Sequence, residues 1–174
     1  MKLFKGMSDK ELTRSIALNG IVAALYVVLV YAAFPLSYGM IQFRIAEMLI
    51  LLCFFRPNLI FGLTLGCFLA NIGSTMPLWD MLFGTLATLI SCIGIIYAPR
   101  LLVAVFIPVV ANALVVGAEL TLIFGDAPFW VNAGFVALGE FVVLIVGYAI
   151  VMGLMRLKKF YPLIGATKHL EVQW

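Results

Sequence analysis

Charged side chains are scarce in this chain of 174 residues, where Asp, Glu, Lys and Arg together make up 11%. Hydrophobic residues make up 65%, and the mean hydropathy is +1.18. Soluble domains carry about 25% charged residues, so this composition excludes a soluble fold and indicates a membrane protein. A membrane-spanning helix needs ~20 mainly apolar residues, which leaves room for about five or six spans.

Residues that bind metals or form disulfides are also rare. His169 is the single histidine and lies near the C-terminus, which excludes a histidine metal site. Cys53, Cys67 and Cys92 fall in separate apolar runs without a CxxC spacing. That pattern favours buried small hydrophobic residues over a redox or metal site. The sequence therefore predicts no metal and no cofactor.

A phosphate-binding loop of the form GxxxxGK[ST] is absent from the sequence, as is any soluble region that could hold one. If the chain drives uphill transport, the energy must come from an ion gradient or from a separate ATPase. We expect no enzymatic activity from the chain itself.

Six apolar runs are present, separated by turn-forming residues. They cover residues 15–34, 45–55, 59–72, 78–98, 101–124 and 129–155. The second run is too short to span comfortably unless residues 40–44 join its helix. We predict an all-α polytopic membrane protein in which residues 1–174 form a single integral membrane domain. Residues 1–14 are charged and precede a run long enough to span, so no cleavable signal is expected.

Basic residues predict the orientation. Ten of the eleven Lys and Arg residues lie on one side of a six-helix arrangement, at both ends of the chain and at the Arg56 and Arg100 turns. The positive-inside rule places that side in the cytoplasm, which makes residues 1–14 and 156–174 cytoplasmic segments. A five-helix arrangement would place one basic cluster outside. Because these residues lie at membrane edges, they indicate topology and not a nucleic-acid partner. Arg44 is the exception.

Polar side chains occur in the outer half or near the middle of five of the expected helices. The set is Glu47, Asn71, Asp80, Asn112, Glu119, Asn132 and Glu140. An ionised carboxylate at mid-bilayer costs at least ~2.5 kcal/mol and usually has a function. Four acids with one nearby base, Arg44, favour a cationic or donor-rich ligand, or protonation of some acids. We therefore predict a polar ligand site that opens outward.

Two structural alternatives apply to these polar residues. Each asparagine is a candidate either for a ligand contact or for a hydrogen bond that only joins two helices. Asp80 and Asn132 are also candidates for helix N-caps at the membrane interface. Aromatic residues near the outer side, including Trp79 and Trp130, fit either an interfacial belt or a stacking wall for a flat ligand. Residues 34–43 are candidates for a lid.

Small residues recur at four-residue spacing in two places. Gly62, Gly66 and Ala70 are expected to pack against another helix of the same bundle, the usual role of this spacing. Gly20 and Ala24 lie in the first run and either do the same or present a flat face to another subunit. The sequence leaves these two alternatives open.

Several segments resemble proteins of the QueT family. The similar segments are residues 23–29, 34–39, 41–47, 66–71, 80–89, 112–119 and 129–140, within residues 15–155. The most specific element is Gln42-Phe43-Arg44-x-x-Glu47. QueT proteins are substrate-binding (S) components of energy-coupling factor (ECF) transporters, associated with queuosine precursors.

The resemblance implies six helices with both termini cytoplasmic in a bacterial plasma membrane, and an outward-facing cavity covered by the first outer loop. It implies as partners a membrane coupling subunit, on which the small residues Gly20 and Ala24 would dock, and two ABC ATPases. The implied ligand is a 7-deazaguanine queuosine precursor. The expected substrate contacts are Gln42, Arg44, Glu47, Asn71, Asp80, Asn112, Glu119, Trp130 and Glu140.

The role of each contact stays open, because Arg44 has an alternative in a structural ion pair with Glu47, three residues on along a helix. Three other functions also compete with the resemblance. They are an S component for another heteroaromatic vitamin, a self-sufficient ion-coupled transporter or channel, and a structural membrane subunit.

Overall fold

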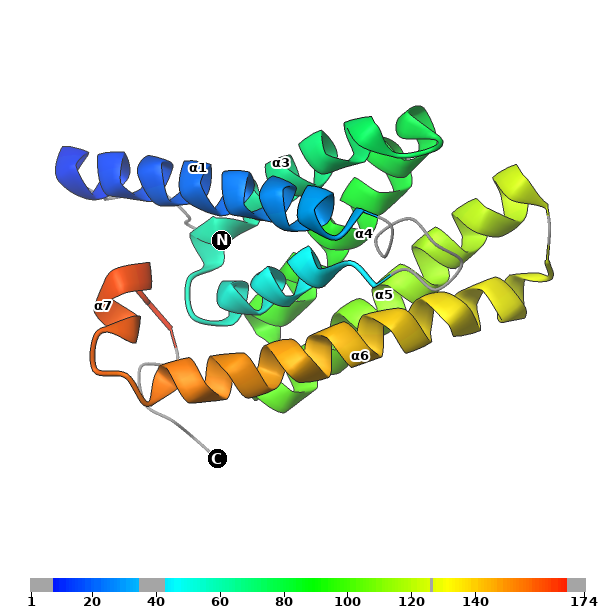
Figure 1. The fold of residues 1–174 in the computed structure, drawn as a ribbon. Coiled ribbons are helices and arrows are strands. Elements are labelled where there is room, and N and C mark those ends of the chain that lie inside the picture. Colours follow the sequence, from blue (N-terminus) through cyan, green and yellow to red (C-terminus); the bar gives the residue numbers. More distant parts are fainter. Residues whose placement is uncertain (1–7, 35–42, 126, 169–174) are drawn as a thin grey trace.

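The computed structural model describes residues 8–34, 43–125 and 127–168 and shows a bundle of helices (Figure 1). In chain order the helices are α1 (Asp9–Ala32), η1 (Ile45–Phe54), η2 (Pro57–Leu59), α3 (Ile60–Ala70), η3 (Asn71–Gly73), α4 (Pro77–Tyr97), α5 (Leu101–Glu119), η4 (Leu120–Phe124), α6 (Phe129–Met155) and α7 (Phe160–Ile164). The described residues contain no strand. The predicted all-α fold is confirmed.

Four of these helical stretches are long and apolar enough to cross a membrane: α1, α4, α6, and α5 continued to Ile123. The other two apolar runs form the shorter helices Ile45–Phe54 and Pro57–Gly73. The chain is therefore a multi-pass membrane protein. The count of six full crossings stays a prediction, because two of the six apolar helices are short.

The helix η1 is a ten-residue 3₁₀ helix at the centre of the bundle. It starts only after Arg44, whose ψ of 84° is not helical, so Phe43 and Arg44 do not extend it. At ~2.0 Å per residue a 3₁₀ helix of this length spans about 20 Å, against about 30 Å for the hydrocarbon core. It packs against α1, α4, α5 and α6, and Ile50, Leu51 and Cys53 are fully buried.

The first helix begins at Asp9, earlier than the predicted start of the apolar run at Ser15. The reason is a capping box. The Ser8 hydroxyl accepts from the Glu11 backbone N–H at 3.4 Å, and the Glu11 carboxylate accepts from the Ser8 backbone N–H at 2.9 Å. These two hydrogen bonds pair N–H groups at the start of the helix, so the helix begins before the apolar run.

Close packing of α3 on α1 confirms the predicted role of the small residues in α3. A Cβ added at Gly62 would lie 2.5 Å from the Asn19 carbonyl oxygen, and one at Gly66 would lie 2.8 Å from the Tyr26 Cβ. The Asn19 side chain also accepts a 2.6 Å hydrogen bond from the backbone N–H of Gly62. Asn19 thereby satisfies an N–H in the first turn of α3, which that helix cannot pair internally.

The residues after α6 fold back onto the bundle, which the sequence did not predict. Arg56 donates hydrogen bonds to the carbonyls of Ile164 at 2.8 Å and Gly165 at 3.2 Å. Arg14 donates to the Pro162 carbonyl. Desolvation, and then the neighbouring charge of Arg14, lower the pKa of Arg56 from its ordinary value. The two guanidinium groups therefore bind the last carbonyls of α7 together, where cations are favoured.

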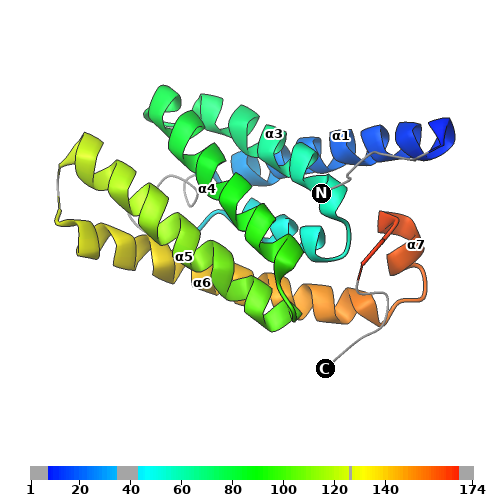
Figure 2. The ribbon, with the colours of Figure 1, turned by 180° about the vertical axis from the view of Figure 1, so that it is seen from behind.

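This C-terminal segment also reaches the ends of η1 and α4. The backbone N–H groups of Thr167 and Lys168 donate to the Phe55 carbonyl at 2.9 and 3.0 Å, and the Lys168 ammonium donates to the Ile96 carbonyl at 2.8 Å. Figures 1 and 2 show α7 at the same end of the bundle as the start of α1. The described basic residues of both termini and of the Arg56 turn are thus gathered at one end.

Candidate functional site

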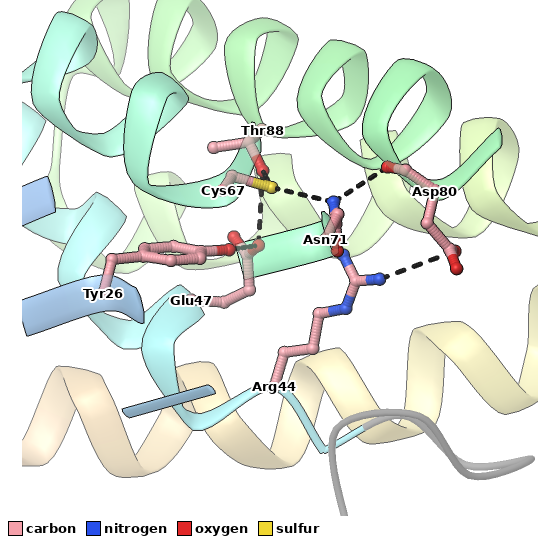
Figure 3. A network of polar contacts seen from close by, with 7 residues as sticks. All are labelled: Tyr26, Arg44, Glu47, Cys67, Asn71, Asp80 and Thr88. Carbon is pink, nitrogen blue, oxygen red and sulfur yellow. Dashed lines mark hydrogen bonds and ion pairs between the residues drawn. The ribbon is translucent and has the colours of Figure 1, made fainter. Parts of the chain in front are cut away.

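A cluster of buried polar side chains lies between α1, η1, α3 and α4 (Figure 3). Its members are Tyr26 on α1, Arg44 and Glu47 at the start of η1, Cys67 and Asn71 at the end of α3, and Asp80 and Thr88 on α4. Each of the seven residues is at most 5% exposed. We call these seven residues the central cluster.

Glu47 connects three elements in the central cluster. Its Oε1 accepts a hydrogen bond from the Tyr26 hydroxyl and lies 3.3 Å from the Thr88 hydroxyl. The same Thr88 hydroxyl lies 3.2 Å from the Cys67 sulfur. Among the described residues, Glu47 Oε2 has no hydrogen-bond partner. Oε1 of Glu47 is therefore held by its neighbours, and Oε2 offers a hydrogen-bond acceptor.

Arg44 forms an ion pair with Asp80, and the two charged groups are 3.8 Å apart. The charge of Arg44 also acts on Glu47, whose hydrogen-bond partners are Tyr26 and Thr88. The predicted alternative of an Arg44–Glu47 ion pair along one helix is therefore replaced by a pair between η1 and α4. Gly84 makes room for it, because an added Cβ would lie 3.0 Å from an Arg44 guanidinium nitrogen.

Asn71 joins the ends of α3 and α4. Its side-chain amide donates to the Asp80 backbone carbonyl at 2.8 Å and lies 3.6 Å from the Cys67 sulfur. The asparagine is 2% exposed. The structure therefore gives Asn71 a role in packing, whether or not it also contacts a ligand.

Glu140 and Asn112 form a second buried polar pair, between α6 and α5. The Asn112 amide donates to Glu140 Oε1 at 3.3 Å and to the Pro108 carbonyl at 3.2 Å. The two side chains are 3% and 4% exposed. Glu47 and Arg44 of the central cluster are electrostatic neighbours of Glu140.

Glu119 is the last residue of α5 and is 1% exposed. Neither oxygen of its carboxylate has an N–H or hydroxyl partner among the described residues. The carboxyl of Asp80 lies close enough to that of Glu119 for the two to share a proton, and Arg44 is a further electrostatic neighbour. The structure therefore brings all four predicted intramembrane acids into the neighbourhood of one guanidinium group.

Other predicted residues lie outside this arrangement. Trp130 is 79% exposed at the start of α6 and packs edge to face on Phe129. Asn132 donates to the Thr121 hydroxyl at 3.0 Å and to the Ala127 carbonyl at 3.2 Å. These bonds correspond to the structural alternative, in which the asparagine joins neighbouring segments. Neither Asp80 nor Asn132 is an N-cap, because α4 and α6 begin after Met76 and Pro128. Gln42 and most of the predicted lid lie outside the described residues.

Two grooves lie on the outside of the bundle and contain none of the predicted ligand contacts. One, of about 490 Å³, is lined by apolar residues and two threonines of α3 and α4. The other, of about 280 Å³, lies between α1 and α3 and includes Gly20. Gly20 and Ala24 are both exposed, and a Cβ added at Gly20 would meet no atom within 4 Å. Neither residue is used for packing inside the bundle.

Sequence reasoning missed Tyr26, Thr88 and Gly84. The signal for two of them was available, because Asp80, Gly84 and Thr88 recur every four residues and so share one face of α4. Tyr26 was a single polar tip within an apolar run, which is a weaker signal. Its partner Glu47 is far away in the sequence, so the pairing needed the tertiary structure.

Chemically, the site combines one donor group of fixed charge with several carboxylate acceptors. A guanidinium donates to carbonyl or anionic groups, and carboxylates accept from N–H groups in pairs. Within the described part of the chain, no group of three His, Cys, Asp or Glu residues could hold a metal ion. The arrangement suits recognition of a polar small molecule with several N–H donors.

Comparisons with known proteins identify the family of this chain. The QueT transporter family matches residues 16–156, a range that includes α1 from Ile16, the whole central cluster and Glu140. A relative from Lactococcus lactis subsp. cremoris (strain MG1363), the Queuosine precursor transporter QueT, is 32% identical over 157 residues. That alignment covers 79% of this chain and 90% of the relative. No solved structure matches. The family match spans most of a multi-pass membrane protein with a buried polar centre, and the chain therefore belongs to the QueT transporter family.

Proposed function

We propose that this chain is the substrate-capture subunit of an ECF transporter and that it binds a 7-deazaguanine queuosine precursor. The Lactococcus relative is a queuosine precursor transporter, and this supports the ligand class. The observation that carries the proposal is the buried cluster in which one guanidinium faces several carboxylates, with open acceptor atoms on Glu47 and Glu119.

The chemistry of the ligand fits such a cluster. A 7-deazaguanine presents adjacent N–H donors on its ring edge, which a carboxylate accepts in pairs, and a carbonyl oxygen that needs a donor. Glu47 Oε2 and both oxygens of Glu119 are acceptors without an N–H or hydroxyl partner among the described residues, and Arg44 is a donor. In the proposal Arg44, Glu47, Asp80 and Glu119 line the site.

Asn71, Asn112 and Glu140 hold the walls of the site in the proposal. Gln42 and Trp130 are further ligand contacts in the proposal. The proposed location is the bacterial cell membrane, with both chain ends cytoplasmic and the site opening outward.

The partners in the proposal are a membrane coupling subunit and two ABC ATPases. The sequence has no phosphate-binding loop of its own. An exposed small-residue face at Gly20 and Ala24 is available for a partner helix, because small residues allow two helices to approach closely.

Calorimetry on the purified full-length chain in detergent tests the ligand. We expect 7-deazaguanine precursors to bind at least about tenfold more tightly than guanine, with no binding of riboflavin. Glu47→Gln should weaken precursor binding, whereas the matched exposed control Glu11→Gln should not. Precursor binding no tighter than that of guanine would show that the proposed ligand is wrong.

Transport assays in liposomes test the coupling. The chain alone should bind but give no sustained uptake, and uptake should require the coupling subunit, both ATPases and ATP. Gradient-driven flux by the chain alone would instead support a self-sufficient ion-coupled transporter. Absence of both binding and flux would support a structural subunit.

A further inference from the structure

Two arginine side chains lie next to each other at the end of the bundle that holds α7. Arg14 is on α1, and Arg56 lies between η1 and η2. A Cβ added at Gly165, directly after α7, would lie within 4 Å of both guanidinium groups. Arg14 is also the neighbouring charge that acts on Arg56. Two like charges are therefore held together by segments that are distant in the sequence. We call Arg14 and Arg56 the arginine pair.

The hydrogen bonds of the arginine pair go only to neutral acceptors. Arg56 donates through Nη1 and Arg14 through Nη2, and every acceptor is a backbone carbonyl of residues 162–165. The other terminal nitrogen of each guanidinium makes no hydrogen bond to a described residue. Neither arginine forms an ion pair with a described carboxylate. The pair therefore keeps both positive charges and has N–H donors left for an anion.

The inner arginine of the pair is shielded from water. Arg56 is 5% exposed, and its Nε is buried without a hydrogen-bond partner among the described residues. A buried charge is costly unless an opposite charge is close to it, and a carbonyl carries only a partial charge. The like charge of Arg14 adds to this cost. The arrangement therefore calls for an anion from outside the described chain.

The position of the arginine pair favours a lipid as the source of this anion. Arg14 comes directly before the apolar run of α1, where Ile16 is 62% exposed. The segment after α6 lies at the same end of the bundle, and its Leu157 and Leu163 are 57% and 70% exposed (Figures 1 and 2). Exposed apolar side chains beside basic ones are typical of a membrane–water interface. Residues 141–168 contain no Asp or Glu that would repel an anionic headgroup.

We propose that Arg14 and Arg56 together bind the phosphate of an anionic phospholipid headgroup. A phosphodiester supplies the missing negative charge, and its oxygens accept from the planar fork of a guanidinium more strongly than a neutral carbonyl does. A zwitterionic headgroup has the same phosphate but adds a cation, which the two arginines repel. This inference does not depend on the proposed function, because it requires only that the chain spans a membrane.

Native mass spectrometry of the purified full-length chain in detergent tests the site by lipid titration. The probes are dioleoyl phosphatidylglycerol and dioleoyl phosphatidylcholine, which have the same acyl chains and differ in headgroup charge. The unaltered protein should bind phosphatidylglycerol at least about tenfold more tightly. Arg14→Gln changes an exposed side chain and should weaken phosphatidylglycerol binding by about tenfold or more. Its effect on phosphatidylcholine should stay below about threefold.

Lys10→Gln is the matched control, because it removes an exposed positive charge one turn earlier on α1. It should change phosphatidylglycerol binding by less than about threefold. Equal losses in Lys10→Gln and Arg14→Gln would show that the lipid responds to the overall positive charge of this end. No loss in Arg14→Gln would separate the arginine pair from the lipid. Both results overturn the inference.

Two measurements on the unaltered protein decide the question if Arg14→Gln does not fold. Equal affinities for the two lipids overturn the inference, and a preference of about tenfold or more for phosphatidylglycerol supports it. Inorganic phosphate in large molar excess is then added to the lipid complex. Retention of phosphatidylglycerol supports a lipid site, whereas its displacement would make the ligand a soluble phosphate and overturn the assignment to a lipid.

Discussion

The hydroxyl of Tyr26 on α1 donates a hydrogen bond to the buried carboxylate of Glu47 on η1. Tyr26 is 1% exposed and Glu47 is fully buried. The bond attaches the short central helix to a long outer helix at the level of the polar site. Fold stability and the geometry of the site therefore depend on the same contact, which makes it the first place to test the structure.

Tyr26→Phe should destabilise the fold. The substitution removes the donor and keeps the ring, which leaves the Glu47 oxygen with Thr88 alone. A hydrogen bond to a charged group contributes about 1.5–3 kcal/mol, so the free energy of unfolding should fall by about that amount in an unfolding titration in mixed micelles. The control Tyr97→Phe changes a side chain that is 69% exposed and should have an effect within about 0.5 kcal/mol. Equal stabilities of the two variants would contradict this role of Tyr26.

Gly66→Ala should weaken the contact between α1 and α3. An added Cβ would lie 2.8 Å from the Tyr26 Cβ and 3.0 Å from the Ala23 carbonyl oxygen, so the two helices must move apart. Overpacking of this kind costs about 1–3 kcal/mol, which thermal unfolding in detergent would detect. Gly134→Ala is the matched control, because no atom lies within 4 Å of its added Cβ. The control should be neutral or slightly stabilising, since alanine favours a helix.

Arg56→Ala should release the C-terminal segment without unfolding the bundle. The substitution removes the hydrogen bonds to the Ile164 and Gly165 carbonyls. Trypsin cleavage after Lys158 or Lys159 should become about tenfold faster or more, because cleavage follows the population of the released state. Arg100→Ala removes an exposed arginine and should not change the cleavage rate. A rate unchanged by Arg56→Ala would show that the segment is held mainly by Phe160 and Lys168.

Gly20→Leu tests the exposed face of α1. The added side chain meets no atom of the bundle, so the purified chain should fold and bind its ligand normally. In the proposed complex it should block close approach of a partner helix, and co-purification with the coupling subunit should be lost. Gly153→Leu, at another open position on α6, is the control that should retain the complex. Retained assembly in both variants would remove Gly20 from the docking surface.

Much of the fold was predictable because apolar runs in membrane proteins translate directly into helices. The run at residues 129–155 became α6 with the same bounds, and the run at 78–98 became α4 shifted by one residue. The start of α1 was misplaced because hydropathy does not register a capping box such as Ser8 and Glu11. The 3₁₀ form of η1 was not predictable from a run that is apolar on all sides, since its shape follows from the helices packed around it.

The sequence predicted which acidic residues belong to the candidate site, but it did not predict their hydrogen-bond partners. Charged residues in an apolar sequence are conspicuous, so Glu47, Asp80, Glu119 and Glu140 were identified as a set. The hydrogen-bond partner of each acid is a side chain that is distant in the sequence. Tyr26 pairs with Glu47, and Asn112 with Glu140, across helices whose relative rotation no local pattern encodes.

The sequence by itself therefore determined the class of protein, the bounds of most helices and the segregation of basic residues from buried acids. These properties follow from the cost of placing polar groups in hydrocarbon, which acts on each residue separately. Only the tertiary structure decided that Arg44 pairs with Asp80 and that Glu119 has no N–H or hydroxyl partner among the described residues. It also placed the C-terminal segment on the ends of α1, η1 and α4. Those outcomes depend on which helix faces meet, because hydrogen bonds and ion pairs require groups within a few ångströms and in the correct orientation.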